Sequence, residues 1–195
     1  TPSVGKDKLM RDPSICQAPD GTFHMVWTSS WTDRIIGHAS SRDLIHWSEQ
    51  QAIPVMMHEP TAHNCWAPEL FYDEPSQTYY IFWATTIPGR HKEIPTSESE
   101  KGLNHRIYYA TTKDFRTFSK TKMFFNPDFS VIDAAIVKDP KLGDLIMIVK
   151  NENSNPPEKN LRVTRTKKVE KGFPTKVSAP ITGKYWAEGP APLFV

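Results

Sequence analysis

The sequence predicts an all-β fold, and two features of its 195 residues support this class. Seventeen prolines and six tryptophans are spread along the chain, and proline ends helices because it lacks a backbone N–H donor. Short β-branched and aromatic runs recur between clusters of turn-forming residues. The hydrophobic content of 38% suffices for a real core, so we expect a single domain over residues 1–195.

Charge and composition exclude several classes of protein. The 24 Lys and Arg against 22 Asp and Glu give a net charge of +2, which is no electrostatic signature of a nucleic-acid or membrane partner. No apolar run approaches the ~20 residues of a spanning helix, and no signal-type segment precedes Arg11. Cys16 and Cys65 lack metal-site spacing, and the seven histidines show no paired-ligand spacing, so the sequence supports no metal site.

Regular recurrence of the strands refines the fold class. The run TFHMVWTS (22–29) is followed by TYYIFWAT (78–85) and, more loosely, by DLIMIVKN (144–151). The segments after the first two runs, ASSRDLIHWS (39–48) and ATTKDFRTFS (110–119), match over ten positions without a gap. A two-sheet sandwich predicts no such repeat between distant hairpins, so the pattern favours a β-propeller.

Each repeated unit begins with a further short segment, starting at Asp12, Ala67, Asp133 and Glu188, at intervals of 55, 66 and 55 residues. The polar insertion 88–104 explains the longer interval, and we expect it to be a surface loop. In a propeller, the first strand of each blade lines the central channel. Three of the four starting residues are acids, so we expect Asp12, Asp133 and Glu188 to share one pocket.

Crowded carboxylates raise each other's pKa, so that one can serve as a proton donor while another remains ionised as a base. This division of roles is typical of glycosidic bond cleavage. Inverting enzymes place an acid and a base roughly 6.5–9.5 Å apart, which leaves room for the attacking water.

At this point the chain resembles glycoside hydrolase family 43, whose members are five-bladed β-propellers that act mainly on arabinose- and xylose-containing glycans. Five motifs in family order carry the resemblance: RDPSI (11–15), DLIHWS (43–48), NCWAPELFYD (64–73), VIDAAIVKD (131–139) and WAEGPAPL (186–193). The resemblance implies an inverting glycoside hydrolase for arabinose-, xylose- or galactose-containing glycans, secreted or periplasmic, which needs no cofactor. It also implies that Asp12 is the general base, Asp133 the acid that orients and tunes the donor, and Glu188 the general acid.

Residues near these acids are candidates for sugar binding, because an aromatic face packs against the apolar face of a sugar and polar groups bond its hydroxyls. The candidates are Trp31, Trp66, Trp186, Glu69 and Asn64. Plain core packing remains open for the tryptophans, and a capped turn for Glu69. Lys150 and Glu152 read as a solvated turn, and His58 and His63 as loop residues.

The sequence ends at Val195, in what we expect to be the first strand of a fourth blade. About three and a half blades of the family fold would then be present, as an incomplete glycosidase domain that closes by oligomerising or is part of a longer protein. A non-catalytic carbohydrate-binding or protein-docking propeller is the alternative function. Propeller enzymes that process sucrose carry an Asn-Asp-Pro-Asn motif and a Glu-Cys motif, and this chain has neither.

Overall fold

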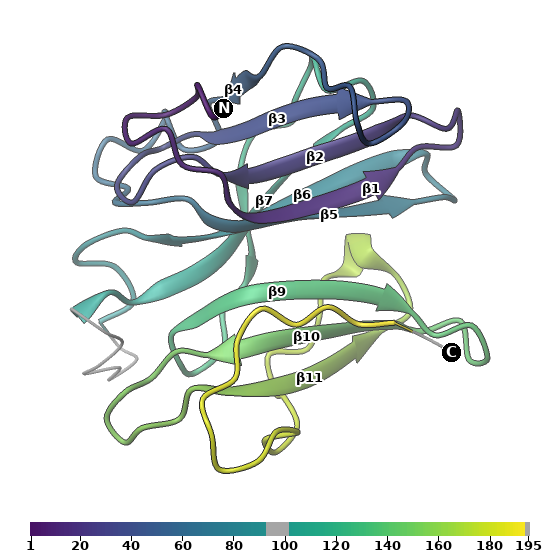
Figure 1. The fold of residues 1–195 in the computed structure, drawn as a ribbon. Helices are drawn as coiled ribbons and strands as arrows, with labels where there is room; N and C mark the ends of the chain where they lie inside the picture. Colours follow the sequence, from purple (N-terminus) through teal and green to yellow (C-terminus); the bar gives the residue numbers. More distant parts are fainter. Residues whose placement is uncertain (93–101, 194–195) are drawn as a thin grey trace.

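The computed structural model describes residues 1–92 and 102–193 and shows three antiparallel β-sheets in chain order (Figure 1). The first sheet contains β1 (Arg11–Gln17), β2 (Phe23–Thr28), β3 (Ile36–Ser41) and β4 (Gln51–Ile53). The second contains β5 (Trp66–Asp73), β6 (Thr78–Thr86), β7 (His105–Thr112) and β8 (Lys122–Phe125). The third contains β9 (Val131–Lys138), β10 (Leu145–Asn151) and β11 (Asn160–Thr166). The described residues form short 3₁₀ turns such as η2 (Val169–Lys171) but no α-helix, so the all-β prediction is confirmed.

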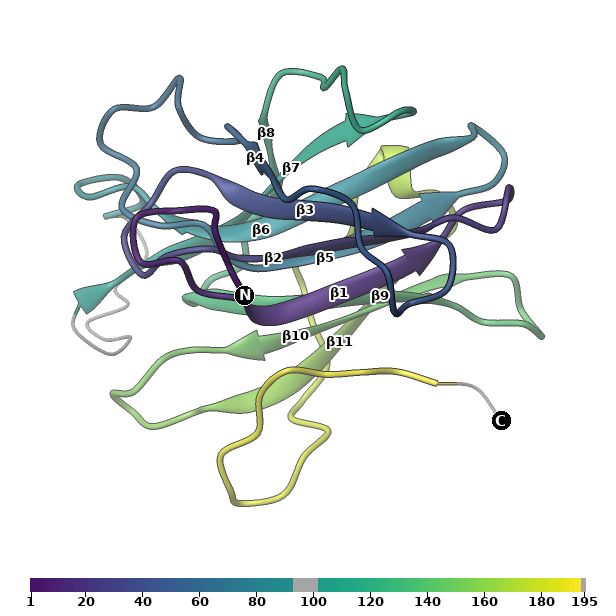
Figure 2. The ribbon, with the colours of Figure 1, turned by 45° about the horizontal axis from the view of Figure 1, so that its top comes forward.

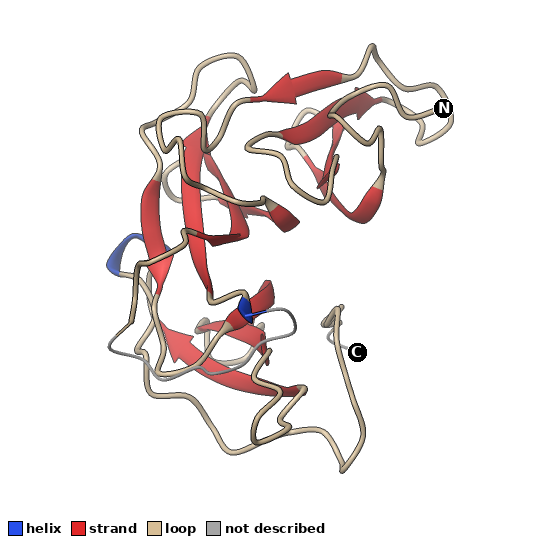
Figure 3. Cartoon of the chain, turned by 90° about the vertical axis from the view of Figure 1, so that its left-hand side faces the viewer, coloured by secondary structure: helices blue, strands red, loops and turns tan. Residues whose placement is uncertain are grey.

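The sheets are the blades of a β-propeller, as the repeats predicted. Within each sheet the strands follow one another as a meander, and the three matched apolar runs are the second strands β2, β6 and β10. The first strands are neighbours, because β1 packs against β5 and β5 against β9. Figure 3 shows the sheets following one another around an arc, with the C-terminal segment continuing it.

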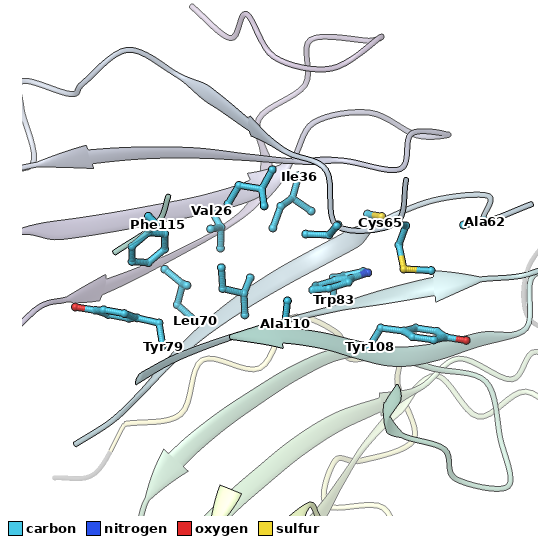
Figure 4. Close-up of a cluster of buried hydrophobic side chains, with 14 of the residues drawn as sticks. Val26, Ile36, Ala62, Cys65, Leu70, Tyr79, Trp83, Tyr108, Ala110 and Phe115 are labelled. Carbon is cyan, nitrogen blue, oxygen red and sulfur yellow. The ribbon is translucent and has the colours of Figure 1, made fainter. Parts of the chain in front are cut away.

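The two larger hydrophobic cores lie between adjacent blades, and β6 shows why. Its side chains alternate, so that Tyr79, Ile81 and Trp83 pack towards the first sheet and Tyr80, Phe82 and Ala84 pack towards the third. A strand buried on both faces reads as a continuous apolar run, which is what residues 78–85 show. Figure 4 shows the first of these cores, in which Val26 and Ile36 face Leu70 and Trp83.

In each of the first two blades, the ten-residue repeat covers the end of the third strand and the turn that follows it. In the first blade, Ser41 Oγ accepts bonds from the N–H groups of Asp43 and Leu44, and Asp43 Oδ1 accepts from Ile45 and His46. In the second blade, Thr112 and Asp114 make the same bonds to the four matching residues, Asp114, Phe115, Arg116 and Thr117. Leu44 (φ 64°) and Phe115 (φ 53°) share the left-handed conformation. The repeated hydroxyl and Asp positions are therefore hydrogen-bond acceptors of one turn.

The C-terminal segment takes the place of a fourth strand in the third blade. The N–H groups of Ser178 and Ile181 donate to the carbonyls of Val163 and Leu161 in β11, and the Ala187 N–H donates to the carbonyl of Lys159, directly before β11. Figures 1 and 2 show this segment, in yellow, beside the third sheet. The expected inner strand of a fourth blade is not formed by the described residues 188–193. Of the expected surface loop 88–104, residues 93–101 lie outside the described part of the chain.

Gly37 provides a stability test, because it pairs with Trp27 across β2 and β3 and the indole lies over it. A Cβ built on Gly37 would lie 2.0 Å from Trp27 Cε2, and Trp27 is fully buried. We expect Gly37→Ala to lower the free energy of unfolding by about 1–3 kcal/mol, the usual cost of overpacking a core, measured by urea denaturation. In a Trp27→Leu background the cost of Gly37→Ala should shrink, and an unchanged cost would contradict this packing.

Candidate active site

The inner strands β1, β5 and β9 share a backbone irregularity near their first residues. Asp12, Ala67 and Asp133 have left-handed φ angles of 48°, 44° and 51°, and each lies where the pairing with the second strand shifts register. Such β-bulges are frequent beside active sites because they redirect a side chain. Asp12 and Asp133 therefore occupy equivalent positions of two blades.

Glu188 departs from this equivalence by one residue. In the fourth segment the left-handed residue is Gly189 (φ 58°), so Glu188 corresponds to Arg11 of the first blade rather than to Asp12. The predicted shared register of the three acids is therefore offset at Glu188. Its carboxylate reaches the same region from a different backbone position.

One pocket of about 800 Å³ is lined by Asp12, Asp133 and Glu188 together. Trp31, Trp66, Trp186 and Glu69, which the sequence singled out for substrate binding, also line it. The pocket additionally contains residues that sequence reasoning missed as site residues: Arg11, His105 and Lys159. Asn64 is not among the described residues that line it.

Asp12 lies beside a hydroxyl that connects the first two blades. Thr28 Oγ1 donates a 3.3 Å hydrogen bond to Asp12 Oδ2 and accepts one of 2.8 Å from the Ala67 N–H. The hydroxyl of Thr28 thus connects the bulges of β1 and β5. Asp12 itself is exposed, so its carboxylate is in contact with water.

Asp133 lies in a much less polar environment. The pKa of Asp133 is raised to about 6, chiefly by burial and in smaller part by the nearby carboxylates of Asp12 and Glu188. The Gly189 N–H, which donates a 3.1 Å hydrogen bond to Asp133 Oδ2, and the Lys150 ammonium act in the opposite direction. Asp133 therefore binds a proton more readily than an ordinary aspartate does.

Glu188 is exposed and ion-paired. Lys150 Nζ donates a 2.8 Å hydrogen bond to Glu188 Oε2, whose side chain is 69% exposed. This bond and the charge of Lys150 hold the pKa of Glu188 below its usual value despite partial burial, and Lys159 and Arg11 add to the effect. Glu188 and Asp133 thus have proton affinities shifted in opposite directions.

Lys150 and Glu152 are buried, so the prediction of a solvated turn is wrong. Lys150 is 4% exposed and Glu152 is 6% exposed. Lys150 Nζ lies 2.8 Å from Glu152 Oε2, and Lys159 Nζ, also buried, donates to Glu152 Oε1. Burial opposes the charge of Lys150, but the Glu152 and Glu188 carboxylates outweigh it and raise the pKa of the ammonium. The polar composition of residues 150–153 favours a solvated turn, because the sequence alone does not show which distant residues pair with them.

The tryptophans of the pocket differ in accessibility. Trp31 is 45% exposed and Trp186 is 74% exposed, whereas Trp66 is half-buried against His105. Trp66 Nε1 donates to the Trp31 carbonyl, and the two rings meet edge to face at 6.0 Å. The Arg11 guanidinium lies 4.4 Å from the centre of the Trp31 ring and covers one of its faces. The exposed rings therefore offer apolar surface at the mouth of the pocket.

Two polar candidates differ in position. Burial raises the pKa of Glu69 to about 7, opposed by a bond from Ser14, and its side chain belongs to the pocket wall. Asn64 is fully buried: its side chain bonds His105 Nε2 at 2.8 Å and accepts from the Thr86 N–H. His105 and His63 both line the pocket, so Asn64 contacts the pocket wall from behind. His63 differs in this from the simple loop residue we expected.

No metal site is formed by the described residues, because no group of three or more His, Cys, Asp or Glu side chains among them is arranged to hold an ion. Within the same ranges, no helix has the length and apolar character needed to cross a membrane.

Comparison with known proteins places this geometry in a family. A family model related to glycoside hydrolase family 43, described as a probable glycosyl hydrolase domain, matches residues 1–191. The chain belongs to this family. The resemblance found in the sequence is thereby confirmed.

Solved structures confirm the fold of this family-43-related chain. A thermostable family-43 glycoside hydrolase superimposes with a TM-score of 0.64 at 15% identity, over 90% of this chain and 54% of that one. An exo-β-1,3-galactanase from Phanerochaete chrysosporium with galactose has a TM-score of 0.58 at 16% identity, over 89% and 38% of the two chains. In sequence, an α-L-arabinofuranosidase from Bifidobacterium longum subsp. longum is 24% identical over 104 residues, which are 50% of this chain and 10% of that protein. The chain thus spans about half, or less, of the length of these relatives.

The raised pKa of Asp133 gives a stability prediction with a definite sign. The folded state binds the extra proton between pH 3.8 and about 6, so the contribution of this carboxyl is fully present at low pH and is lost as the pH rises through about 6. Asp133→Asn keeps an oxygen acceptor for Gly189 but cannot ionise. The difference between the free energies of unfolding of Asp133→Asn and wild type should therefore increase, in favour of the variant, by up to about 3 kcal/mol between pH 4 and 7, at about 1.4 kcal/mol per pKa unit.

The measurement is urea denaturation at pH 4, 5, 6 and 7. Asp128→Asn, which changes an exposed aspartate, is the matched control and should follow the wild-type pH dependence. A curve for Asp133→Asn that runs parallel to wild type would show that the buried carboxyl is not the cause.

Proposed function

We propose that this chain is the catalytic part of a glycoside hydrolase that cleaves arabinose-, xylose- or galactose-containing glycans by inverting acid/base catalysis. The observation that carries the proposal is the convergence of Asp12, Asp133 and Glu188, from three blade-starting segments, in one tryptophan-rich pocket. Family membership over residues 1–191 supports the reaction class. The similarity to an arabinofuranosidase and a galactanase supports arabinose and galactose among these sugars.

Asp12 is the proposed general base. It is exposed, and its bond from Thr28 fixes the carboxylate without replacing all of its contact with water. A carboxylate that accepts a proton from water must be ionised and must be reachable by that water. Asp12 meets the second condition better than the half-buried Asp133 does.

Glu188 is the proposed general acid, although its bond to Lys150 lowers its pKa and so favours the ionised form. A sugar that docks against Trp186, two residues away, would remove the Glu188 side chain from water. Desolvation favours the neutral form of a carboxyl, so binding itself would increase its proton affinity. Asp133 accepts a hydrogen bond from the Gly189 N–H, and in its ionised form its negative charge would also increase the proton affinity of Glu188.

A second candidate is a carbohydrate-binding propeller without turnover. The ion pair between Lys150 and Glu188 favours it, because a carboxylate held by an ammonium is a poor proton donor. Both functions use the same pocket, and only product formation separates them.

The test is hydrolysis of aryl α-L-arabinofuranosides, β-D-xylosides and β-D-galactosides and of the corresponding natural glycosides. Asp12→Ala should abolish turnover of every substrate, since water must be deprotonated whatever leaves. Glu188→Ala should reduce hydrolysis of natural glycosides by about 10²–10⁴-fold but largely spare dinitrophenyl glycosides, whose leaving group needs little protonation. NMR of the first-formed product should show inverted anomeric configuration.

Asp128→Ala, which removes an exposed carboxylate, is the control for these variants and should be fully active. Retention of configuration, or equal losses of Glu188→Ala on activated and natural substrates, would refute the assigned roles. Sugar binding detected by calorimetry with no product from any substrate would establish the binding module instead.

A further inference from the structure

The segment that carries Glu188 is fastened to the third blade at three consecutive residues. The Ala187 N–H donates to the Lys159 carbonyl at 2.9 Å, and the Gly189 N–H donates to Asp133 Oδ2 at 3.1 Å. These two bonds hold the backbone on either side of Glu188. The side chain between them is held by Lys150 Nζ at 2.8 Å.

Lys150 is itself rigidly placed. It belongs to β10 and pairs with Ile132 of β9, the residue directly before Asp133. Its ammonium lies 2.8 Å from Glu152 Oε2, and Glu152 is fixed from its other oxygen by Lys159. The side chains of all three residues are only 5–8% exposed. Buried charges of this kind keep their geometry because each needs its partner.

The two side chains of the ion pair differ strongly in exposure. The side chain of Glu188 is 69% exposed, whereas that of Lys150 is 5% exposed. A glutamate on an irregular surface segment has several rotamers available, and fixing one costs conformational entropy. The buried ammonium supplies the charge-assisted hydrogen bond that selects one rotamer.

We propose that Lys150, held by Glu152, is the positioning residue for Glu188: it aims the carboxylate into the pocket and competes with a glycosidic oxygen for Glu188 Oε2. The catalytic consequence depends on the proposed function, whereas the positioning itself does not. Substrate must weaken this bond before Glu188 can carry and donate a proton. Lys150 would therefore set the upper pH limit of catalysis without contacting the reacting atoms.

The direct test is ¹³C NMR titration of the Glu188 carboxyl in the full chain without substrate, with the signal assigned from its loss in Glu188→Gln. Lys150→Met should move the titration midpoint of Glu188 upward, and Lys150→Arg, which keeps the charge, should bring it back towards wild type. Lys167→Met removes an exposed lysine that pairs with Asp144, and as the matched control it should leave the midpoint unchanged. An unchanged midpoint in a folded Lys150→Met variant would overturn the proposal.

A reciprocal measurement covers the case in which Lys150→Met does not fold. Glu188→Gln changes an exposed side chain, and by thermodynamic linkage the loss of its charge must lower the pKa of Lys150, which ¹⁵N NMR of the lysine ammonium reports. No change there would equally overturn the proposal. In an active enzyme, Lys150→Met should also move the upper limb of the kcat/KM profile to higher pH. Absence of hydrolysis would contradict the proposed function, while the two titrations would still decide the role of Lys150.

Discussion

The bulge at the beginning of each inner strand is the constraint on which the pocket depends. A regular inner strand directs successive side chains alternately into the two cores that flank its blade, as β6 shows for a second strand. A carboxylate directed into such a core would be buried without water, which is strongly unfavourable. The left-handed residue interrupts the alternation at Asp12 and Asp133, so the strand can begin with an acid in the pocket and continue with residues that pack. Each of these inner strands can therefore pair with the second strand of its blade and still place its acid in the pocket.

This backbone conformation needs support, since a left-handed non-glycine residue costs of the order of 1–3 kcal/mol. Aspartate tolerates it better than most residues do, which suits Asp12 and Asp133. Ala67 has no such side chain, but its N–H is bonded by Thr28 Oγ1, which also bonds Asp12. The strain at one bulge is therefore relieved by a contact that also orients a proposed catalytic group. Stability and function share the same hydroxyl here.

The sequence predicted the repeated features of the blades well. It predicted less well those features that depend on contacts between residues far apart in the chain. The matched ten-residue segments and apolar second strands recur because each blade solves the same local problem, and they were found without a structure. Lys150 and Glu152 are buried beside partners that lie elsewhere in the sequence, because Lys150 Nζ bonds Glu188 and the Glu152 N–H donates to the Ser130 carbonyl. Asn64, proposed for sugar binding because it lies near Glu69 in the sequence, is not among the described residues that line the pocket, and its amide bonds His105 of the pocket wall. Local pattern cannot distinguish the two sides of a pocket wall.

The charges of the pocket finally explain how one site can keep two similar acids in different protonation states. Asp133 is half-buried and lies near Asp12 and Glu188, so its proton affinity rises. Glu188 is exposed and bonded to Lys150, so its proton affinity falls. Lys150 lies close to both, yet it donates its hydrogen bond to Glu188 and reaches Asp133 only through its field. A shift of the ammonium away from Glu188 would raise the proton affinity of both acids at once. Because Lys150 is anchored by Glu152 and Glu188 is not buried, the movable partner is the glutamate. The exposed side chain is thus the proposed general acid, and the buried, anchored side chain is the one proposed to position it.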